Sequence, residues 1–104
     1  ARAASEYASL PEEQAALLSV ETHLAVGRGA VRVDPALAAR ALHRAATQHP
    51  QHPEAARACV LLARLYGERL GEEAKARELF AHVVAQYPET PAARFAAQRL
   101  QGLA

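Results

Sequence analysis

Apolar side chains recur at intervals of three and four residues along most of this 104-residue chain. Cys59, Leu62 and Tyr66 have this spacing, and Ala76 and Phe80 continue it further along. Because an α-helix turns every 3.6 residues, such spacing gathers the apolar side chains on one helix face. No segment of useful length alternates apolar and polar positions with a period of two, as a half-buried strand would. The pattern therefore predicts an all-α fold.

Prolines and glycines divide the chain into five helix-length segments. Asp34-Pro35 and Thr90-Pro91 are typical of helix starts, because the Asp and Thr side chains accept hydrogen bonds from free backbone N–H groups and proline fits the first turn. Gly27-Arg28-Gly29 and Gly71 are expected to end helices. The predicted helices are approximately residues 12–26, 35–48, 53–69, 72–86 and 91–103.

The helical pattern repeats at an offset of 38 residues. The turn Pro50-x-x-Pro53 recurs as Pro88-x-x-Pro91, and residues 50 and 88 are 38 positions apart. A shared register across two helices and a turn is typical of helical repeat proteins, in which each hairpin stacks on the next. We therefore predict one domain over residues 1–104, with approximate repeats at 12–50 and 51–88 and an extra helix at 91–103. The offset relates Ala38 to Ala76, Leu42 to Phe80, Ala45 to Val83, Ala55 to Ala93, Ala58 to Ala96, Leu62 to Leu100 and Leu65 to Leu103, and, backwards, Leu62 to Leu24 and Ala63 to Ala25.

The residues at these repeated positions resemble the tetratricopeptide repeat (TPR) family. The resemblance implies a right-handed stack of about five helices, paired as antiparallel hairpins in an α-solenoid. The offset is longer than the usual TPR period of about 34 residues, and Cys59 and Ala97 stand where the family usually has a large aromatic residue. The matching residues are Leu62, Ala63, Tyr66, Ala76, Phe80, Val83 and Pro88, and less completely Leu24, Ala25, Ala38, Leu42, Ala45 and Pro50.

The segment from Tyr87 to Ala93 is similar to a subset of these repeats found in bacterial cell-envelope proteins. Its sequence, Tyr-Pro-Glu-Thr-Pro-Ala-Ala, is like repeats of the Tol-Pal accessory protein and of the outer-membrane assembly lipoprotein. This likeness slightly favours the periplasm or cell envelope over the cytoplasm as the location of the chain.

The segment before Pro11 has two interpretations. Tyr7-Ala8-Ser9-Leu10 resembles the end of an earlier second helix, as Val84 to Tyr87 precedes Pro88. Alternatively, Ser9 is a helix cap and Glu12 completes a capping box. The sequence leaves both interpretations open.

The charge balance excludes some classes of partner. The chain has 12 basic and 11 acidic residues, for a formal net charge of +1. So small a net charge argues against general attraction to nucleic acid or anionic membranes.

No stretch approaches the roughly 18 apolar residues of a membrane span, so no direct membrane insertion is expected. No apolar segment like the central region of a signal peptide follows residues 1–5.

The chemistry-bearing residues give no indication of catalysis, of a cofactor or of a metal. His49 and His52 flank Pro50 and lack the helical spacing of zinc ligands, so they are interpreted as exposed turn residues. His23, His43 and His82 are expected to face solvent. The single cysteine, Cys59, excludes an internal disulfide and lies at a core position, which favours a buried thiol over a reactive one. Paired glutamates at 12–13 and 72–73 open helices, where negative charge is favourable.

The TPR resemblance implies a protein–protein interaction module, because the first helices of such hairpins line a concave groove. Arginines there would bind carboxylates of an acidic or C-terminal peptide segment, with Phe95 as an apolar anchor. The alternative is that Phe95 packs beneath the end of the domain and the arginines are ordinary solvated charges. The candidate groove residues are Thr22, Val26, Arg57, Val60, Arg64, Phe95, Gln98 and Arg99.

Two other functions remain open at this stage. The exposed ends of the stack could pair two chains into a homo-oligomer, which is a structural role. The chain could also be a regulatory domain of a larger envelope or membrane protein.

Overall fold

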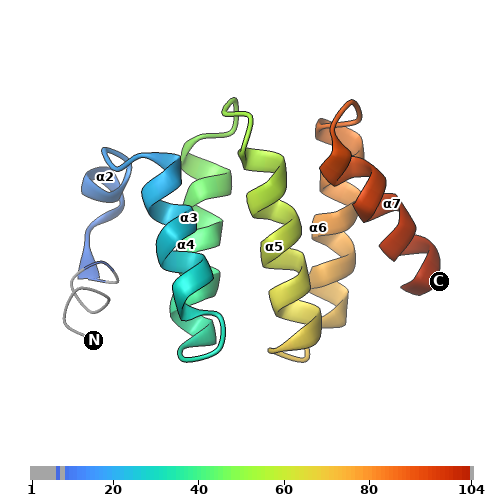
Figure 1. Ribbon diagram of the computed structural model, residues 1–104, viewed down its shortest axis with the longest axis horizontal. Helices are drawn as coiled ribbons and strands as arrows, with labels where there is room; N and C mark the ends of the chain where they lie inside the picture. Colours follow the sequence, from blue (N-terminus) through green and yellow to red (C-terminus); the bar gives the residue numbers. More distant parts are fainter. Residues whose placement is uncertain (1–6, 8, 104) are drawn as a thin grey trace.

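The computed structural model describes residue 7 and residues 9–103, with the side chain of Leu103 excepted. The predictions for residues 1–5, for Ala8 and for the Leu103 side chain therefore lie outside the described part. Within that part the chain forms helices and no strand, which confirms the all-α prediction (Figure 1). The six helices are α2 (Glu12–Ala15), α3 (Val20–Ala30), α4 (Pro35–Gln48), α5 (Ala55–Glu68), α6 (Glu73–Gln86) and α7 (Pro91–Leu103).

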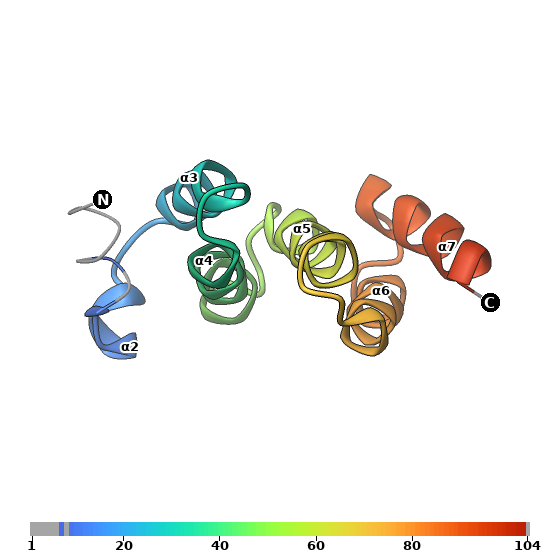
Figure 2. The same ribbon diagram turned by 90° about the horizontal axis from the view of Figure 1, so that it is seen from below.

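The five longer helices form two layers. Figure 2 shows α3, α5 and α7 in one layer and α4 and α6 in the other. From α3 to α7, each helix packs on the next one along the chain, and α5 also touches α7. The result is an elongated array that measures 40 × 28 × 17 Å.

Local side-chain chemistry sets several helix ends, as the sequence predicts. The Asp34 carboxylate accepts a hydrogen bond from the Leu37 N–H at 3.2 Å, and the Thr90 hydroxyl accepts one from the Ala93 N–H at 3.1 Å. These bonds satisfy backbone donors that the first turn of a helix leaves free. After α5, Gly71 has a φ of +66°, a conformation that a side chain disfavours.

The 38-residue offset is present in the helix bounds. Residues 35–48 of α4 map onto residues 73–86, which are the bounds of α6, and α3 and α5 end at residues 30 and 68. Burial follows the same offset in the second helices, where Leu42 and Phe80 are both buried. Burial does not follow the offset throughout the first helices, because Cys59, Val60 and Ala63 are buried whereas the corresponding residues Glu21, Thr22 and Ala25 are exposed.

The predicted helix at residues 12–26 is wrong in both its continuity and its end. The chain breaks after α2, and the Ser19 hydroxyl caps α3 by accepting a hydrogen bond from the Thr22 N–H at 3.1 Å. Helix α3 then runs through Gly27-Arg28-Gly29 to Ala30. A Cβ on Gly27 would lie 2.9 Å from side-chain carbons of Leu42, so this glycine permits close packing of α3 on α4. Packing here outweighs the cost of about 1 kcal/mol for glycine in a helix.

The apolar core consists of two clusters that α5 connects. Leu62 and Leu65 of α5 pack with Leu42 in the first cluster, while Cys59 packs with Phe80 in the second. One helix thus contributes to both clusters from different faces, and Cys59 is buried as predicted. In the described residues, no helix is both long enough and apolar enough to span a bilayer.

Candidate functional site

Three of the predicted groove residues come together on the α3–α5–α7 layer. The guanidinium carbons of Arg64 and Arg99 each lie 5.8 Å from the centre of the Phe95 ring. Phe95 is half-buried against Phe80, with 6.2 Å between the ring centres, so one part of the ring packs and another part remains accessible. We call Arg64, Phe95 and Arg99 the arginine–phenylalanine cluster.

Glu68 joins the two arginines of this cluster. Its Oε2 lies 3.2 Å from Arg64 Nε and 3.5 Å from Arg99 Nη2. All three side chains are between 41% and 46% exposed, so solvent weakens these ion pairs. An incoming carboxylate can therefore compete with Glu68 for the arginines.

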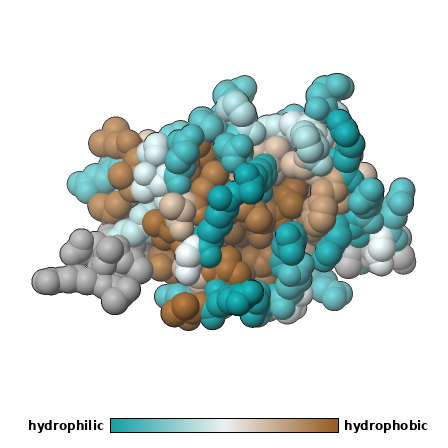
Figure 3. All heavy atoms as spheres, viewed as in Figure 1, coloured by the Kyte–Doolittle hydropathy of each residue, from teal (hydrophilic) through white to brown (hydrophobic). Residues whose placement is uncertain are grey.

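A cavity of about 220 Å³ adjoins the cluster between α3 and α5. Arg64 and Glu68 line it, and so do Arg28, Arg32 and Arg69, which we call the basic rim. No ion pair joins the basic rim to another residue in the part of the chain that the structure describes. Figure 3 shows this face of the molecule, where hydrophobic atoms lie among hydrophilic ones.

The other predicted groove residues do not join this cluster. Val60 is buried in the second core cluster and Val26 is half-buried against the first, so neither is the exposed contact that the prediction required. Thr22 is exposed and its hydroxyl lies 3.0 Å from that of Ser19, at the cap of α3. Arg57 pairs with Glu54 at 3.6 Å near the start of α5. Gln98 is exposed on α7.

The basic rim is not predictable from the sequence alone. The sequence predicts a helix that ends near residue 26, before Arg28 and Arg32, whereas α3 runs to Ala30 and carries Arg28 in its last turn. The spacing of four residues between the two arginines is visible in the sequence. Recognising their proximity to Arg69 requires the packing of α3 against α5.

A second polar site lies at the other end of the array, around the buried Arg44. Its guanidinium donates hydrogen bonds to the backbone carbonyls of Tyr7 at 2.9 Å and Leu10 at 2.7 Å. It also forms an ion pair with Glu12 at 3.2 Å. Arg44 is 1% exposed, so its charge is satisfied by groups from a segment more than 30 residues away. We call this the N-terminal polar network.

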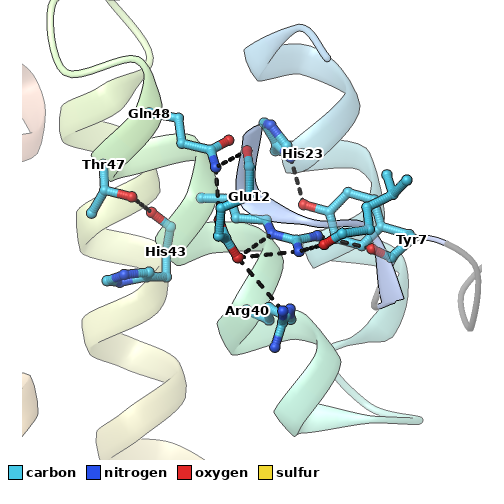
Figure 4. A network of polar contacts seen from close by, with 9 residues as sticks. Tyr7, Glu12, His23, Arg40, His43, Thr47 and Gln48 are labelled. Carbon is cyan, nitrogen blue, oxygen red and sulfur yellow. Dashed lines mark hydrogen bonds and ion pairs between the residues drawn. The ribbon is translucent and has the colours of Figure 1, made fainter. Parts of the chain in front are cut away.

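His23 belongs to this network and is fully buried, which contradicts the prediction that it faces solvent. Its Nδ1 is hydrogen-bonded to the Tyr7 hydroxyl (Figure 4), while its Nε2 is buried without a partner among the described residues. Burial and the neighbouring His49 lower the pKa of His23, because both disfavour the charged ring. The ring is therefore a neutral, packed side chain.

The turn histidines are also more buried than expected. His49 Nε2 lies 3.0 Å from the Leu18 carbonyl oxygen, and His52 Nε2 lies 3.5 Å from Glu21 Oε2. Both rings are half-buried, because the turn packs against Leu18, which precedes α3, and against Glu21 in the first turn of α3. His43 and His82 are exposed, as predicted.

The fold buries the single cysteine, Cys59. Burial raises the pKa of the Cys59 thiol, so the protonated form prevails near neutral pH.

Ser9 and Tyr7 are both helical and Pro11 precedes α2, so the Ser9 capping-box interpretation is wrong. No group of three or more His, Cys, Asp or Glu side chains converges on a metal-sized site within the described residues.

A larger cavity of about 430 Å³ opens between α4, α5 and α6. It is lined by Leu62 and Tyr66, with His43 and His82 at the sides. Its nearby cation, Lys75, is already paired with Glu72 at 2.8 Å. Within the described residues, this cavity therefore lacks the uncompensated positive charge that distinguishes the basic rim.

Comparisons with protein-family models, with curated proteins and with solved structures yield no match for this chain.

Proposed function

We propose that this chain is a protein–protein interaction domain, built as a TPR-like right-handed stack, that binds a protein or peptide segment on its α3–α5–α7 layer. The observation that carries the proposal is the arginine–phenylalanine cluster beside the unpaired basic rim. Helix bounds that repeat at 38 residues support the repeat architecture. The resemblance to envelope repeats favours the periplasm or cell envelope as the place of action.

The chemistry of the cluster suits recognition of a peptide. Arginine presents several N–H donors in a rigid plane, which match the two oxygens of a carboxylate. A half-buried aromatic ring such as Phe95 provides apolar contact area at small entropic cost. Glu68 pairs with both Arg64 and Arg99 beside the ring, so both guanidinium groups are directed to one site.

Binding is favoured over catalysis by the state of the reactive side chains. The Cys59 thiol is buried with a raised pKa, and the buried His23 is engaged by Tyr7. The exposed histidines, His43 and His82, line the larger cavity, and within the described residues neither ring is hydrogen-bonded to a nucleophilic side chain. A binding role uses the arginines without requiring any of these groups.

Self-association through α7 is the second candidate, and one observation disfavours it. Ala56 and Ala63 are buried on α5, in the cluster that packs on α6. At the 38-residue offset, α7 has the exposed residues Arg94 and Gln101 instead. The outer face of α7 is thus polar where a further helix would need small apolar side chains.

The proposal is tested by affinity capture with the protein and with an Arg64→Glu/Arg99→Glu variant. We expect the variant to lose the specific partners, because it replaces two carboxylate-binding cations with anions beside Glu68. Arg94→Glu is the control, since Arg94 is an exposed arginine outside the cluster. Circular dichroism checks that all three proteins remain helical. Equal capture of the same partners by folded wild type and folded double variant contradicts the proposal.

A further inference from the structure

The cavity between α3 and α5 combines an apolar wall with a basic rim. Its volume is about 220 Å³, and its apolar wall includes Leu42, Leu61 and Leu65. Leu42 and Leu65 are buried, and Leu61 is half-buried. An apolar cavity of about 150 Å³ holds a benzene molecule. The α3–α5 cavity therefore has room for one aromatic or leucine-sized side chain.

The rim of this cavity carries uncompensated positive charge. Arg28, Arg32 and Arg69 form no ion pair within the described residues, and the one acidic side chain in the lining is Glu68. Glu68 is already engaged by Arg64 and Arg99. A ligand that places carboxylates on the rim neutralises three arginines without displacing an existing pair.

We propose that this cavity binds one large apolar side chain of an acidic peptide segment, whose flanking carboxylates pair with Arg28, Arg32 and Arg69. The inference rests on the proposed function and specifies the partner's chemistry. The apolar side chain fills the space lined by the leucines, and the carboxylates bind at the rim. The segment continues toward Arg64 and Phe95, because Arg64 belongs both to the cavity lining and to the arginine–phenylalanine cluster.

Two features favour an acidic peptide over nucleic acid. The leucine-lined wall offers no polar groups for base edges and no aromatic ring for base stacking. The net charge of +1 gives little general attraction to a polyanion. Positive charge is instead concentrated at one small apolar cavity, which suits a short segment with a few carboxylates.

The probe is a fluorescein-labelled nine-residue peptide with phenylalanine at its centre and glutamates on both sides, acetylated and amidated at its ends. Binding is measured by fluorescence anisotropy at low and high salt. Replacing the central phenylalanine with alanine, or the glutamates with glutamines, is expected to weaken binding about tenfold or more, since each change removes one of the two interactions. These peptide variants leave the protein unchanged, so folding cannot account for the result.

The matching protein variant is Arg28→Glu/Arg32→Glu, which alters two exposed side chains. We expect it to bind the parent peptide about tenfold more weakly or worse. Lys75→Glu/Arg94→Glu changes the net charge by the same amount away from the cavity and is expected to retain the affinity of the wild type. Equal weakening in both double variants would show a general charge effect and overturn the inference.

Two further results would also overturn it. One is equal binding of the phenylalanine and alanine peptides, and the other is tighter binding of a labelled single-stranded oligonucleotide of the same charge. Affinity capture separates this inference from the proposed function. If partners are lost with Arg64→Glu/Arg99→Glu but retained with Arg28→Glu/Arg32→Glu, the domain binds protein and the cavity assignment is wrong.

Discussion

Among the individual residues, Arg44 and His23 have the most unusual environments. Arg44 is a buried cation whose donors meet two backbone carbonyls and the Glu12 carboxylate. Removing a partner from such a site leaves a buried charge unpaired, which is costly. The two residues together hold the segment containing Tyr7 against α3 and α4.

Burial of neutral His23 predicts that the protein loses stability in acid. Its pKa lies below the value of about 6.5 for a free histidine. The unfolded chain then binds a proton more readily than the folded one, so the stabilisation is complete above about pH 6.5 and is lost as the pH falls below it. The titratable and charged side chains around the His23 ring are those of Tyr7, His49, Arg44 and Glu12.

Urea unfolding at several pH values measures this effect. The contribution of His23 has a slope of at most about 1.4 kcal/mol per pH unit. A His23→Phe variant retains a ring and cannot titrate, so its stability should depend less on pH below about 6.5. Identical pH profiles for the two proteins would contradict the assignment of the acid sensitivity to His23.

At the scale of single elements, α3 shows how packing decides the end of a helix. Both its N-cap at Ser19 and its continuation through two glycines differ from the predicted helix. Gly27 faces Leu42 at close range, whereas a Cβ on Gly29 would meet nothing within 4 Å. The two glycines therefore have opposite roles, although they are two residues apart in one helix.

Alanine substitutions distinguish the two glycines. Gly29→Ala should stabilise the protein by about 0.5–1 kcal/mol, since alanine is the better helix former and the site is open. Gly27→Ala gains the same propensity but forces Leu42 to move within a packed core, at a cost of about 1–3 kcal/mol. We expect Gly27→Ala to lower the midpoint of thermal unfolding while Gly29→Ala raises it. A rise of equal size in both variants would mean that Gly27 is not a packing residue.

Over the whole molecule, the features predicted correctly were those that local sequence determines. Asp34 and Thr90 accept hydrogen bonds from residues three positions away, and Gly71 needs only its own backbone conformation. The failures depended on distant segments: Gly27 meets α4, and His23 is covered by Tyr7. The spacing of residues along the chain does not show which distant segments will come into contact.

The residues of the candidate site also divide into those that the sequence predicts and those that depend on contacts between distant segments. The sequence predicts Arg64, Phe95 and Arg99 as groove residues, and the structure brings their side chains together. Val26 and Val60 are predicted for the same groove, but core packing covers Val60 and half-buries Val26. The rim residues Arg28 and Arg32 could not be placed, because the true extent of α3 was not predictable from its glycines.

The packing of each helix mainly on its neighbours along the chain has a consequence for how the molecule opens. Unfolding α7 mainly breaks contacts with α6 and α5, whereas unfolding α5 breaks contacts with α4, α6 and α7. An end helix with fewer packing partners opens at a lower free-energy cost than a central helix. Amide hydrogen exchange should therefore be fastest in α7 and slowest in the middle of α5, and uniform exchange across the helices would show a single cooperative unit instead. A ligand bound between α3 and α5 should then slow exchange in the centre of the array more than at α7.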